Sequence, residues 1–323
     1  MITRSLLGLV GLLFLLAALA GTGCDGAANS VDGGLDAGLD ATTEDGGEDG
    51  SGDDAYHPLR VGSEETFEAV TWNLHNFPSE QSSAGHVSSL IIALDLDLVA
   101  VQEIADERAF ADMLSYLPSH DAALSPHVYN QYEYQKVGFV YRKDLLAISQ
   151  VTTLFNGETY AFPRPPLQAH FSCLSPKGCP GDFVAIVIHL KASPGEDNEA
   201  RRRAACRDLK THIDALLAEG TEQVILLGDF NDLLDDDPTD NIYTVFLDDT
   251  DNYRFLSQEL ADRGDYSYIP YPSLLDHVLI TQGLTAEYGL GQTRVLALDK
   301  MDLGFDYEDL VSDHRPVISI FSD

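Results

Sequence analysis

Short apolar runs of strand length recur through residues 61–323, and most of them end at turn-forming or charged residues. Apolar or alternating runs of roughly four to eight residues predict β-strands, because successive side chains of a strand point to opposite faces. We therefore expect strands at residues 67–72, 97–101, 137–141, 145–153, 167–171, 183–189, 223–227, 277–280 and 317–321.

Helical periodicity is clearest at residues 198–219, where apolar side chains return on one face and Gly220 follows as a C-terminal stop. A shorter helical stretch, residues 86–94, precedes the second strand. No internal repeat and no second low-complexity linker divides residues 61–323, which we take as one domain. Strands in runs with helices between them predict two sheets packed face to face with helices outside.

Residues 1–24 follow a different pattern, which predicts an export signal. Arg4 precedes the apolar run 6–20, which is too short to span a bilayer comfortably, and small residues precede Cys24. The small residues resemble a bacterial lipobox, in which the cysteine is acylated after cleavage. Because Gly21 stands where a lipobox usually carries an aliphatic residue, ordinary secretion remains the alternative to a periplasmic or cell-surface lipoprotein.

Residues 25–60 are rich in Gly, Asp and other small or acidic residues, and this composition predicts a disordered acidic linker. The whole chain carries 53 acidic residues against 19 Lys and Arg, a net charge of -34. Without the two cations and ten acids of residues 1–60, 17 cations still face 43 acids. This charge argues against a protein that binds nucleic acid by electrostatic attraction alone. It does not argue against a metal-dependent hydrolase that contacts a few phosphates at one cleft.

The cysteines fit an exported protein. In an oxidising compartment, we expect a disulfide between Cys173 and Cys179, which are close in sequence. Cys206 lies in the long helical pattern, where we expect a buried free thiol.

Five of the apolar runs lead into polar residues at the edge of the predicted sheets, namely Asn73, Glu103, His189, Asp229 with Asn231, and Asp313 with His314. Each alone is explained by a turn or a helix cap. Together, oxygen-bearing side chains and two histidines, without cysteines at ligand spacing, favour magnesium, manganese or calcium over zinc. The matching chemistry is phosphoryl transfer to water, in which a metal neutralises phosphate charge and a histidine activates the nucleophile.

The segments TWNLHNF, VQE, HLKA, GDFND, LLDHVLI and SDHRPV, in this order over residues 71–317, resemble the signature blocks of the endonuclease/exonuclease/phosphatase superfamily. The resemblance implies an α/β (α+β) four-layer sandwich of the deoxyribonuclease I type, with two packed mixed sheets flanked by helices. It also implies a metal-dependent phosphoric diester hydrolase.

Roles follow from the matched positions. The resemblance implies three residues at or near the metal, Asn73, Glu103 and Asp313. It implies five catalytic residues, namely His189, Asp229, Asn231, Asp276 and His314. In this assignment His189 contacts the scissile phosphate, Asp229 and Asn231 orient the nucleophile, and Asp276 holds His314, the general base.

Arg164 and Lys191 are implied as contacts to substrate phosphate, each with a surface role as the alternative. The deoxyribonucleases carry a glutamate that supports the phosphate-side histidine. This chain has Gln135 near that place, with Glu133 close by, which leaves the partner of His189 open. We expect most of the arginines at 201–203 to form a solvated face. Four tyrosines before the LLDH block form either a substrate loop or ordinary packing, namely Tyr253, Tyr266, Tyr268 and Tyr271.

The first hypothesis for function is an exported nuclease that hydrolyses DNA or RNA with magnesium or manganese, with calcium as a further ion. The alternative is a phospholipid, sphingomyelin or inositol-phosphate phosphoesterase on the same core. The membrane-active members carry exposed aromatic residues, whereas the one tryptophan here, Trp72, lies in a strand. A non-catalytic surface binding protein is the remote alternative. Expected partners are nucleic acid and, through lipidated Cys24, a membrane, with no obligate protein partner evident.

Overall fold

The nine predicted strands and three further ones pair into two six-stranded sheets in the computed structural model, which describes residues 59–130, 133–175, 178–289 and 291–322. The predictions for the export signal, for Cys24 and for almost all of the linker lie outside the described residues. Leu59 already packs against the folded domain, so ordered structure begins just before the predicted boundary at residue 61.

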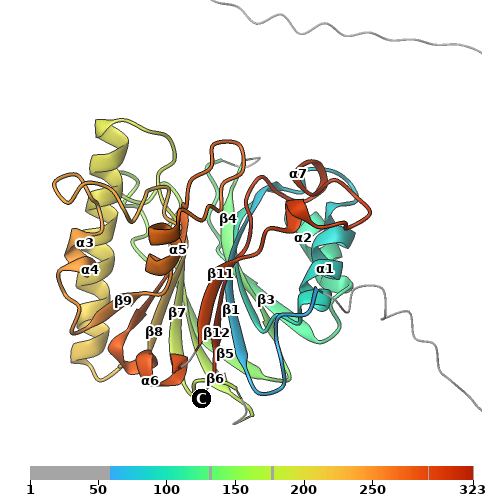
Figure 1. The fold of residues 1–323 in the computed structure, drawn as a ribbon, viewed down its shortest axis with the longest axis horizontal. Coiled ribbons are helices and arrows are strands. Elements are labelled where there is room, and N and C mark those ends of the chain that lie inside the picture. Colours follow the sequence, from blue (N-terminus) through green and yellow to red (C-terminus); the bar gives the residue numbers. More distant parts are fainter. Residues whose placement is uncertain (1–58, 131–132, 176–177, 290, 323) are drawn as a thin grey trace, which may run out of the picture. The chain divides into compact units, whose positions relative to one another are not determined.

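The first sheet has the order β11-β12-β1-β2-β4-β3 (Figure 1). Its strands are β1 (Phe67–Phe77), β2 (Leu98–Ile104), β3 (His120–Leu124), β4 (Lys136–Arg142), β11 (Gln292–Val295) and β12 (Val317–Phe321). β1 and β2 run parallel, and the other pairs are antiparallel. The sheet is therefore mixed.

The second sheet has the order β5-β6-β7-β8-β10-β9. Its strands are β5 (Leu146–Thr153), β6 (Leu167–Cys173), β7 (Phe183–His189), β8 (Val224–Asp229), β9 (Tyr253–Phe255) and β10 (Asp276–Thr281). Here β7 and β8 are the parallel pair. Each sheet thus places two neighbouring strand ends at the same edge, which is where polar residues follow the apolar runs.

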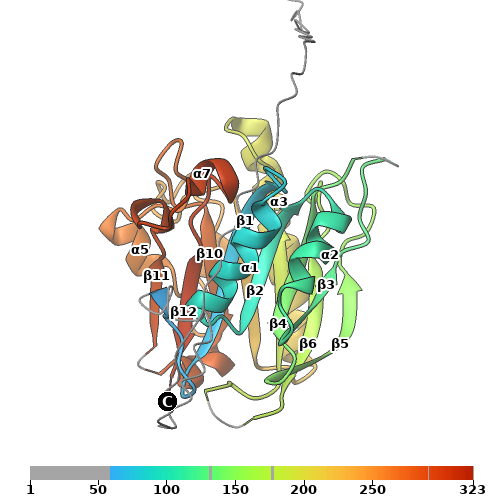
Figure 2. The same ribbon diagram turned by 90° about the vertical axis from the view of Figure 1, so that its right-hand side faces the viewer.

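Helices cover the outer faces of both sheets. The helices are α1 (Ser83–Leu94), α2 (Glu107–Ser115), α3 (Glu196–Ala218), α4 (Thr244–Leu247), α5 (Gln258–Arg263), α6 (Thr285–Tyr288) and α7 (Tyr307–Leu310), with 3-10 turns at Gln282–Leu284 and Leu298–Lys300. α1 and α2 lie over the first sheet and α3 over the second (Figures 1 and 2). The predicted four-layer sandwich is confirmed. Among the described residues, no helix combines the length and apolar character needed to cross a bilayer.

Alternating side chains of β1 explain how one strand serves two interfaces. Phe67 and Ala69 join the core shared with the second sheet and α3, whereas Val70 and Trp72 pack with α1 and α2. A strand buried on both faces reads as a nearly continuous apolar run, because each face meets another layer. This burial is why the central strands were predictable from hydrophobicity.

The cysteine predictions are confirmed. Cys173, at the end of β6, forms a disulfide with Cys179, and Cys206 of α3 is a buried free thiol. Between the bonded cysteines, Gly178 has φ +68°, and a Cβ there would lie 2.5 Å from the carbonyl oxygen of Thr66. The disulfide loop therefore lies directly against the chain as it enters β1.

The chain enters β1 at the end of the first sheet opposite to the polar strand ends. There the backbone N–H of Val61 donates to the Leu94 carbonyl at 3.2 Å. Next to this point Glu68 is 1% exposed, and its N–H donates to Asp97 Oδ2 at 3.1 Å. Burial, followed by contact with Asp97, raises the pKa of Glu68 to about 9. The Glu68 carboxyl is therefore protonated in the folded protein at neutral pH.

We expect the free energy of unfolding to fall less in Glu68→Gln than in the natural chain as the pH rises from about 4 to about 9. Because the folded pKa lies above the unfolded one, the stabilisation from Glu68 is complete below about pH 4 and is lost as pH rises toward about 9. Between these limits the free energy of unfolding in urea should fall less in the variant, by on the order of 2 kcal/mol. Glu64→Gln, at an exposed position, is the matched control. Equal pH slopes for all three proteins would contradict the protonated Glu68.

Candidate active site

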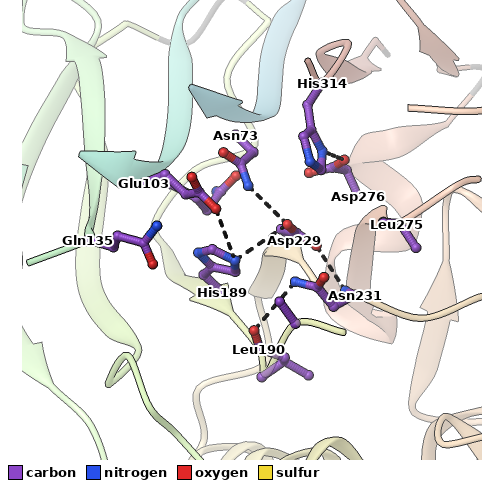
Figure 3. Close-up of polar contacts among 12 residues, drawn as sticks. Asn73, Glu103, Gln135, His189, Leu190, Asp229, Asn231, Leu275, Asp276 and His314 are labelled. Atoms are coloured by element: carbon purple, nitrogen blue, oxygen red, sulfur yellow. Dashed lines mark hydrogen bonds and ion pairs between the residues drawn. The ribbon is translucent and has the colours of Figure 1, made fainter. Parts of the chain in front are cut away.

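The ends of the parallel strands bring the predicted polar residues together. In the second sheet, His189 is the register partner of Asp229, and Asp229 is the register partner of Asp276. Three strands therefore present these side chains in a row, with Asp229 in the middle. Asn73 and Glu103 come from the first sheet and face the row across the interface between the sheets (Figure 3).

Polar contacts join the two sheets at this edge. The Asn73 side-chain amide donates to Asp229 Oδ2 at 3.0 Å. Nε2 of His189 lies 3.5 Å from Asp229 Oδ2 and 3.7 Å from Glu103 Oε1 (Figure 3). On the far side of Asp229, the Asn231 backbone N–H donates to Asp229 Oδ1 at 2.9 Å. Asp229 is therefore the central acceptor of the cluster.

The backbone is left-handed at five non-glycine positions here, with φ of +45° at His75, +49° at Asn76, +60° at Glu103, +79° at Ser193 and +57° at Asn231. Each such residue costs of order 1–3 kcal/mol, so the surrounding structure must hold it in place. The pairing of β2 with β4 is irregular at Glu103, and an irregularity of this kind re-aims a side chain. Glu103 consequently turns toward the site, where its Oε2 accepts from the Asn76 N–H at 2.8 Å.

Asp276 and His314 form a buried pair, as predicted. Nδ1 of His314 lies 2.8 Å from Asp276 Oδ2, and the histidine is 6% exposed (Figure 3). Burial lowers the pKa of His314, but the charge and hydrogen bond of Asp276 and the charges of Asp229 and Asp313 raise it to about 10. Because Nδ1 is engaged with Asp276, Nε2 is the nitrogen left to face the cavity.

Asp313 pairs with a histidine that the sequence analysis did not single out. Nδ1 of His75 lies 3.0 Å from Asp313 Oδ1, and this contact raises the pKa of His75. His75 occurs in the TWNLHNF block, two positions after Asn73. This position, close to the predicted metal-side residue Asn73, was the available signal.

A cavity of about 690 Å³ connects these groups. Its lining includes six of the predicted residues, namely Glu103, His189, Asp229, Asn231, Asp313 and His314. Asn73 and Asp276 lie behind this lining as hydrogen-bond partners of Asp229 and His314. Eight predicted residues are thus brought together.

The donor set fits a hard divalent cation. Glu103, Asp229 and Asp313 present carboxylates to one cavity, and Oδ1 of Asp276 is buried without a hydrogen-bond partner in the part of the chain that the structure describes. A second grouping, Asp229, Asp276 and His314, places ligand-type atoms within 4.8 Å of one another. Oxygen donors of this kind suit magnesium or manganese. Positive charge bound among them would also lower the pKa of His314, because it offsets the field of the carboxylates.

Arg164 and Lys191 do not line the cavity. Arg164 is 8% exposed and donates to the Leu190 carbonyl at 3.1 Å and to Gln135 Oε1 at 3.0 Å. Lys191 donates to the carbonyl of Ala192 at 2.7 Å. Their contact with substrate phosphate stays a prediction.

Within the described residues, His189 meets no carboxylate at its second ring nitrogen, Nδ1. Its Nδ1 is buried without a hydrogen-bond partner among the described residues, while Gln135 bonds to Arg164 and Asn76. Burial, with the charge of Arg164, holds the pKa of His189 well below 6.5. The histidine is therefore neutral in this setting, and Gln135 does not replace a supporting glutamate.

The prediction of a solvated face at residues 201–203 was wrong for Arg202, which is 4% exposed and lines the cavity. Its Nε donates to Asp232 Oδ2 at 2.8 Å, and its Nη1 to the carbonyls of Lys191 and Ser193 at 3.0 Å. A buried arginine is stable here because a carboxylate and backbone oxygens compensate its desolvation. Arg202 thus supports the loops that follow β7 and β8.

The four tyrosines divide into two groups. Tyr268 and Tyr271 line the cavity. Tyr253 is buried, and its hydroxyl donates to Asp214. The guanidinium carbon of Arg315 lies 3.9 Å from the ring centroid of Tyr266. A substrate loop is therefore compatible with the first two, whereas the other two pack within the protein.

Comparison with known proteins supports the fold. The catalytic domain of human nocturnin with bound sulfate anion matches with a TM-score of 0.59 and 20% identity over 81% of this chain and 96% of that one. A protein of the endonuclease/exonuclease/phosphatase family from Bacteroides thetaiotaomicron gives 0.58 and 16%, over 80% and 98%. D. rerio TDP2 complexed with single strand DNA product gives 0.56 and 15%, over 80% and 99%. A search of curated protein sequences finds no significant match.

The family model extends over most of the catalytic core. It matches residues 70–314, which contain every residue predicted for the site. The predicted family and the deoxyribonuclease I type of fold are both confirmed. This chain belongs to the endonuclease/exonuclease/phosphatase family of hydrolases.

Proposed function

We propose that this chain is an exported, divalent-metal-dependent hydrolase of phosphodiester bonds in nucleic acid. The observation that carries the chemistry is the His314–Asp276 pair at 2.8 Å, placed beside the carboxylates of Glu103, Asp229 and Asp313 in one cavity. A base and a set of cation ligands in contact with one cavity are what hydrolysis of a phosphoric diester requires.

In the proposed reaction His314 acts in its neutral form, which cation binding would favour by lowering its pKa from about 10. Its Nε2 takes a proton from water as the water oxygen attacks phosphorus in line with the leaving oxygen. Asp276 fixes the tautomer, since its carboxylate accepts from Nδ1–H and leaves the lone pair on Nε2. The new bond joins water oxygen to phosphorus and the bond to the leaving oxygen breaks. The leaving oxygen, hydrogen-bonded to His189, takes up a proton from solvent, and His314 returns its proton to solvent. Glu103 and Asp313 would hold the cation, with Asn73 beside them as the partner of Asp229, and the cation would neutralise charge on the phosphate.

Two features support nucleic acid as the substrate. D. rerio TDP2, which shares the fold, is complexed with single strand DNA product. The large apolar side chains that are exposed among the described residues include four tyrosines but no tryptophan, the residue whose exposure would favour a membrane-active enzyme. Export is supported by the signal-like residues 1–24 and by the Cys173–Cys179 disulfide, because disulfides persist in oxidising compartments.

We expect the purified full chain to cleave single-stranded DNA, RNA or plasmid DNA in millimolar magnesium or manganese, and EDTA to abolish cleavage. The acidic domain repels polyanions, so divalent cation should be needed for screening as well as for catalysis. Sphingomyelin and inositol phosphates are the comparison substrates, assayed by phosphate-ester release. Cleavage of lipid or inositol phosphate alone would replace nucleic acid as the substrate, and turnover of no substrate would contradict the hydrolase itself.

A further inference from the structure

Tyr271 is 76% exposed, more than any other large apolar residue that the structure describes. It lies between Pro270 and Pro272 in the segment IPYP. Proline fixes its own φ and restricts the residue before it, so both prolines stiffen the backbone around Tyr271. An exposed ring on a stiff backbone loses little conformational entropy when a ligand packs on it.

The segment that carries Tyr271 is attached to the catalytic loop. Tyr268 forms β-bridges with both Ser273 and His314, and the Ile269 N–H donates to the Asp313 carbonyl at 2.9 Å. The position of Tyr271 is therefore fixed relative to the proposed general base by the backbone on both sides of the turn.

The aromatic rings lead outward from the site in a row. The ring centroid of Tyr268 lies 4.9 Å from that of His314, and the centroid of Tyr271 lies 6.4 Å from that of Tyr268. Both tyrosines line the same cavity as His189, Asp229 and His314. A group that packs on these rings therefore lies beside a phosphate held at the catalytic residues.

The chemistry of this wall favours a planar, uncharged partner. The cavity floor is carboxylate-rich, so an anion gains nothing from it without a cation, whereas a tyrosine ring attracts any flat π-system. Nucleobases stack on aromatic side chains irrespective of sequence, because every base has a π-face.

We propose that Tyr268 and Tyr271 form a stacking site for an unpaired nucleobase of the strand whose phosphodiester is cleaved. This inference rests on the proposed function and names its substrate class as single-stranded nucleic acid or frayed ends. A base in a duplex is stacked on its neighbours and must be extruded before it can reach the rings, which disfavours intact duplex.

Binding to the His314→Gln protein tests the stacking site independently of turnover. The probes are a fluorescein-labelled single-stranded DNA and an abasic oligonucleotide of the same length, measured by anisotropy in magnesium. We expect the base-containing strand to bind about tenfold more tightly. Adding Tyr271→Ala should remove this difference, and adding Tyr271→Phe should preserve it. Tyr160→Ala is the matched control, because Tyr160 is also exposed, at 49%, and lies outside the cavity lining.

Steady-state kinetics of Tyr271 variants that keep His314 give a second readout. Tyr271→Ala should raise KM for the single strand about tenfold and leave kcat within about twofold, because stacking contributes to binding rather than to proton transfer. The abasic strand should show no change. The stacking site would be overturned if Tyr271→Ala still bound the base-containing strand more tightly than the abasic strand by the same factor. It would also be overturned if Tyr271→Ala lost binding to sphingomyelin vesicles and kept its preference for the base-containing strand. Failure of the proposed function is seen separately, as absence of turnover by the natural chain on either strand.

Discussion

Replacing His314 by glutamine should lower kcat for phosphodiester hydrolysis by about 10³-fold or more, because a side-chain amide cannot accept the proton of the attacking water. The glutamine can still bond to Asp276, so folding should be preserved. The pair is buried, with 6% exposure at His314 and 0% at Asp276. Initial rates on single-stranded DNA in saturating magnesium measure the loss, and urea unfolding checks the fold.

Asp276→Asn is the companion variant for this experiment. It keeps the imidazole and removes the charge that fixes its tautomer, so we expect a loss of the same order, about 10³-fold. The two losses should not add in the double variant, since both act through one proton acceptor. A near-normal rate for His314→Gln would show that another group is the general base.

Replacing Glu103 by glutamine should lower activity about 10³-fold at fixed magnesium and weaken binding of the cation itself. Glu103 is the carboxylate that the irregular backbone of β2 turns into the cavity, and its Oε2 is already held by the Asn76 N–H. The amide keeps the size of the side chain and removes its negative charge, which is what a hard cation binds. Isothermal titration calorimetry with manganese measures the cation without recourse to activity.

Glu308→Gln is the matched control, because Glu308 is an exposed glutamate on α7 outside the cavity lining. It should leave manganese affinity and turnover unchanged. If Glu103→Gln loses activity but keeps full manganese affinity, Glu103 does not bind the cation and contacts the substrate instead.

The centre of the fold was predictable because its strands are buried on both faces. Apolar runs such as residues 183–189 and 223–227 carry this burial in their sequence, and the polar residue that follows each run marks the sheet edge. That logic led to His189 and Asp229. The family blocks then added Asp276, which lies at the start of its strand, where a search for polar residues after apolar runs does not look.

Other parts of the molecule escaped prediction for physical reasons. β3, β9 and β11 are short edge strands with exposed or partly exposed positions, so hydrophobicity gives them little signal. The burial of Arg202 depends on Asp232, thirty residues away in sequence, and no local pattern reveals such a partner. The same holds for the contact between His75 and Asp313.

The point at which the chain enters β1 lies away from the candidate site. Residues 59–66 join the first sheet at the end remote from the cavity, where the Val61 N–H donates to the Leu94 carbonyl. A solid support or fusion partner joined directly before residue 59 would therefore be attached at the pole opposite to the catalytic residues. Immobilisation through that end should leave the cavity open to a large polymeric substrate.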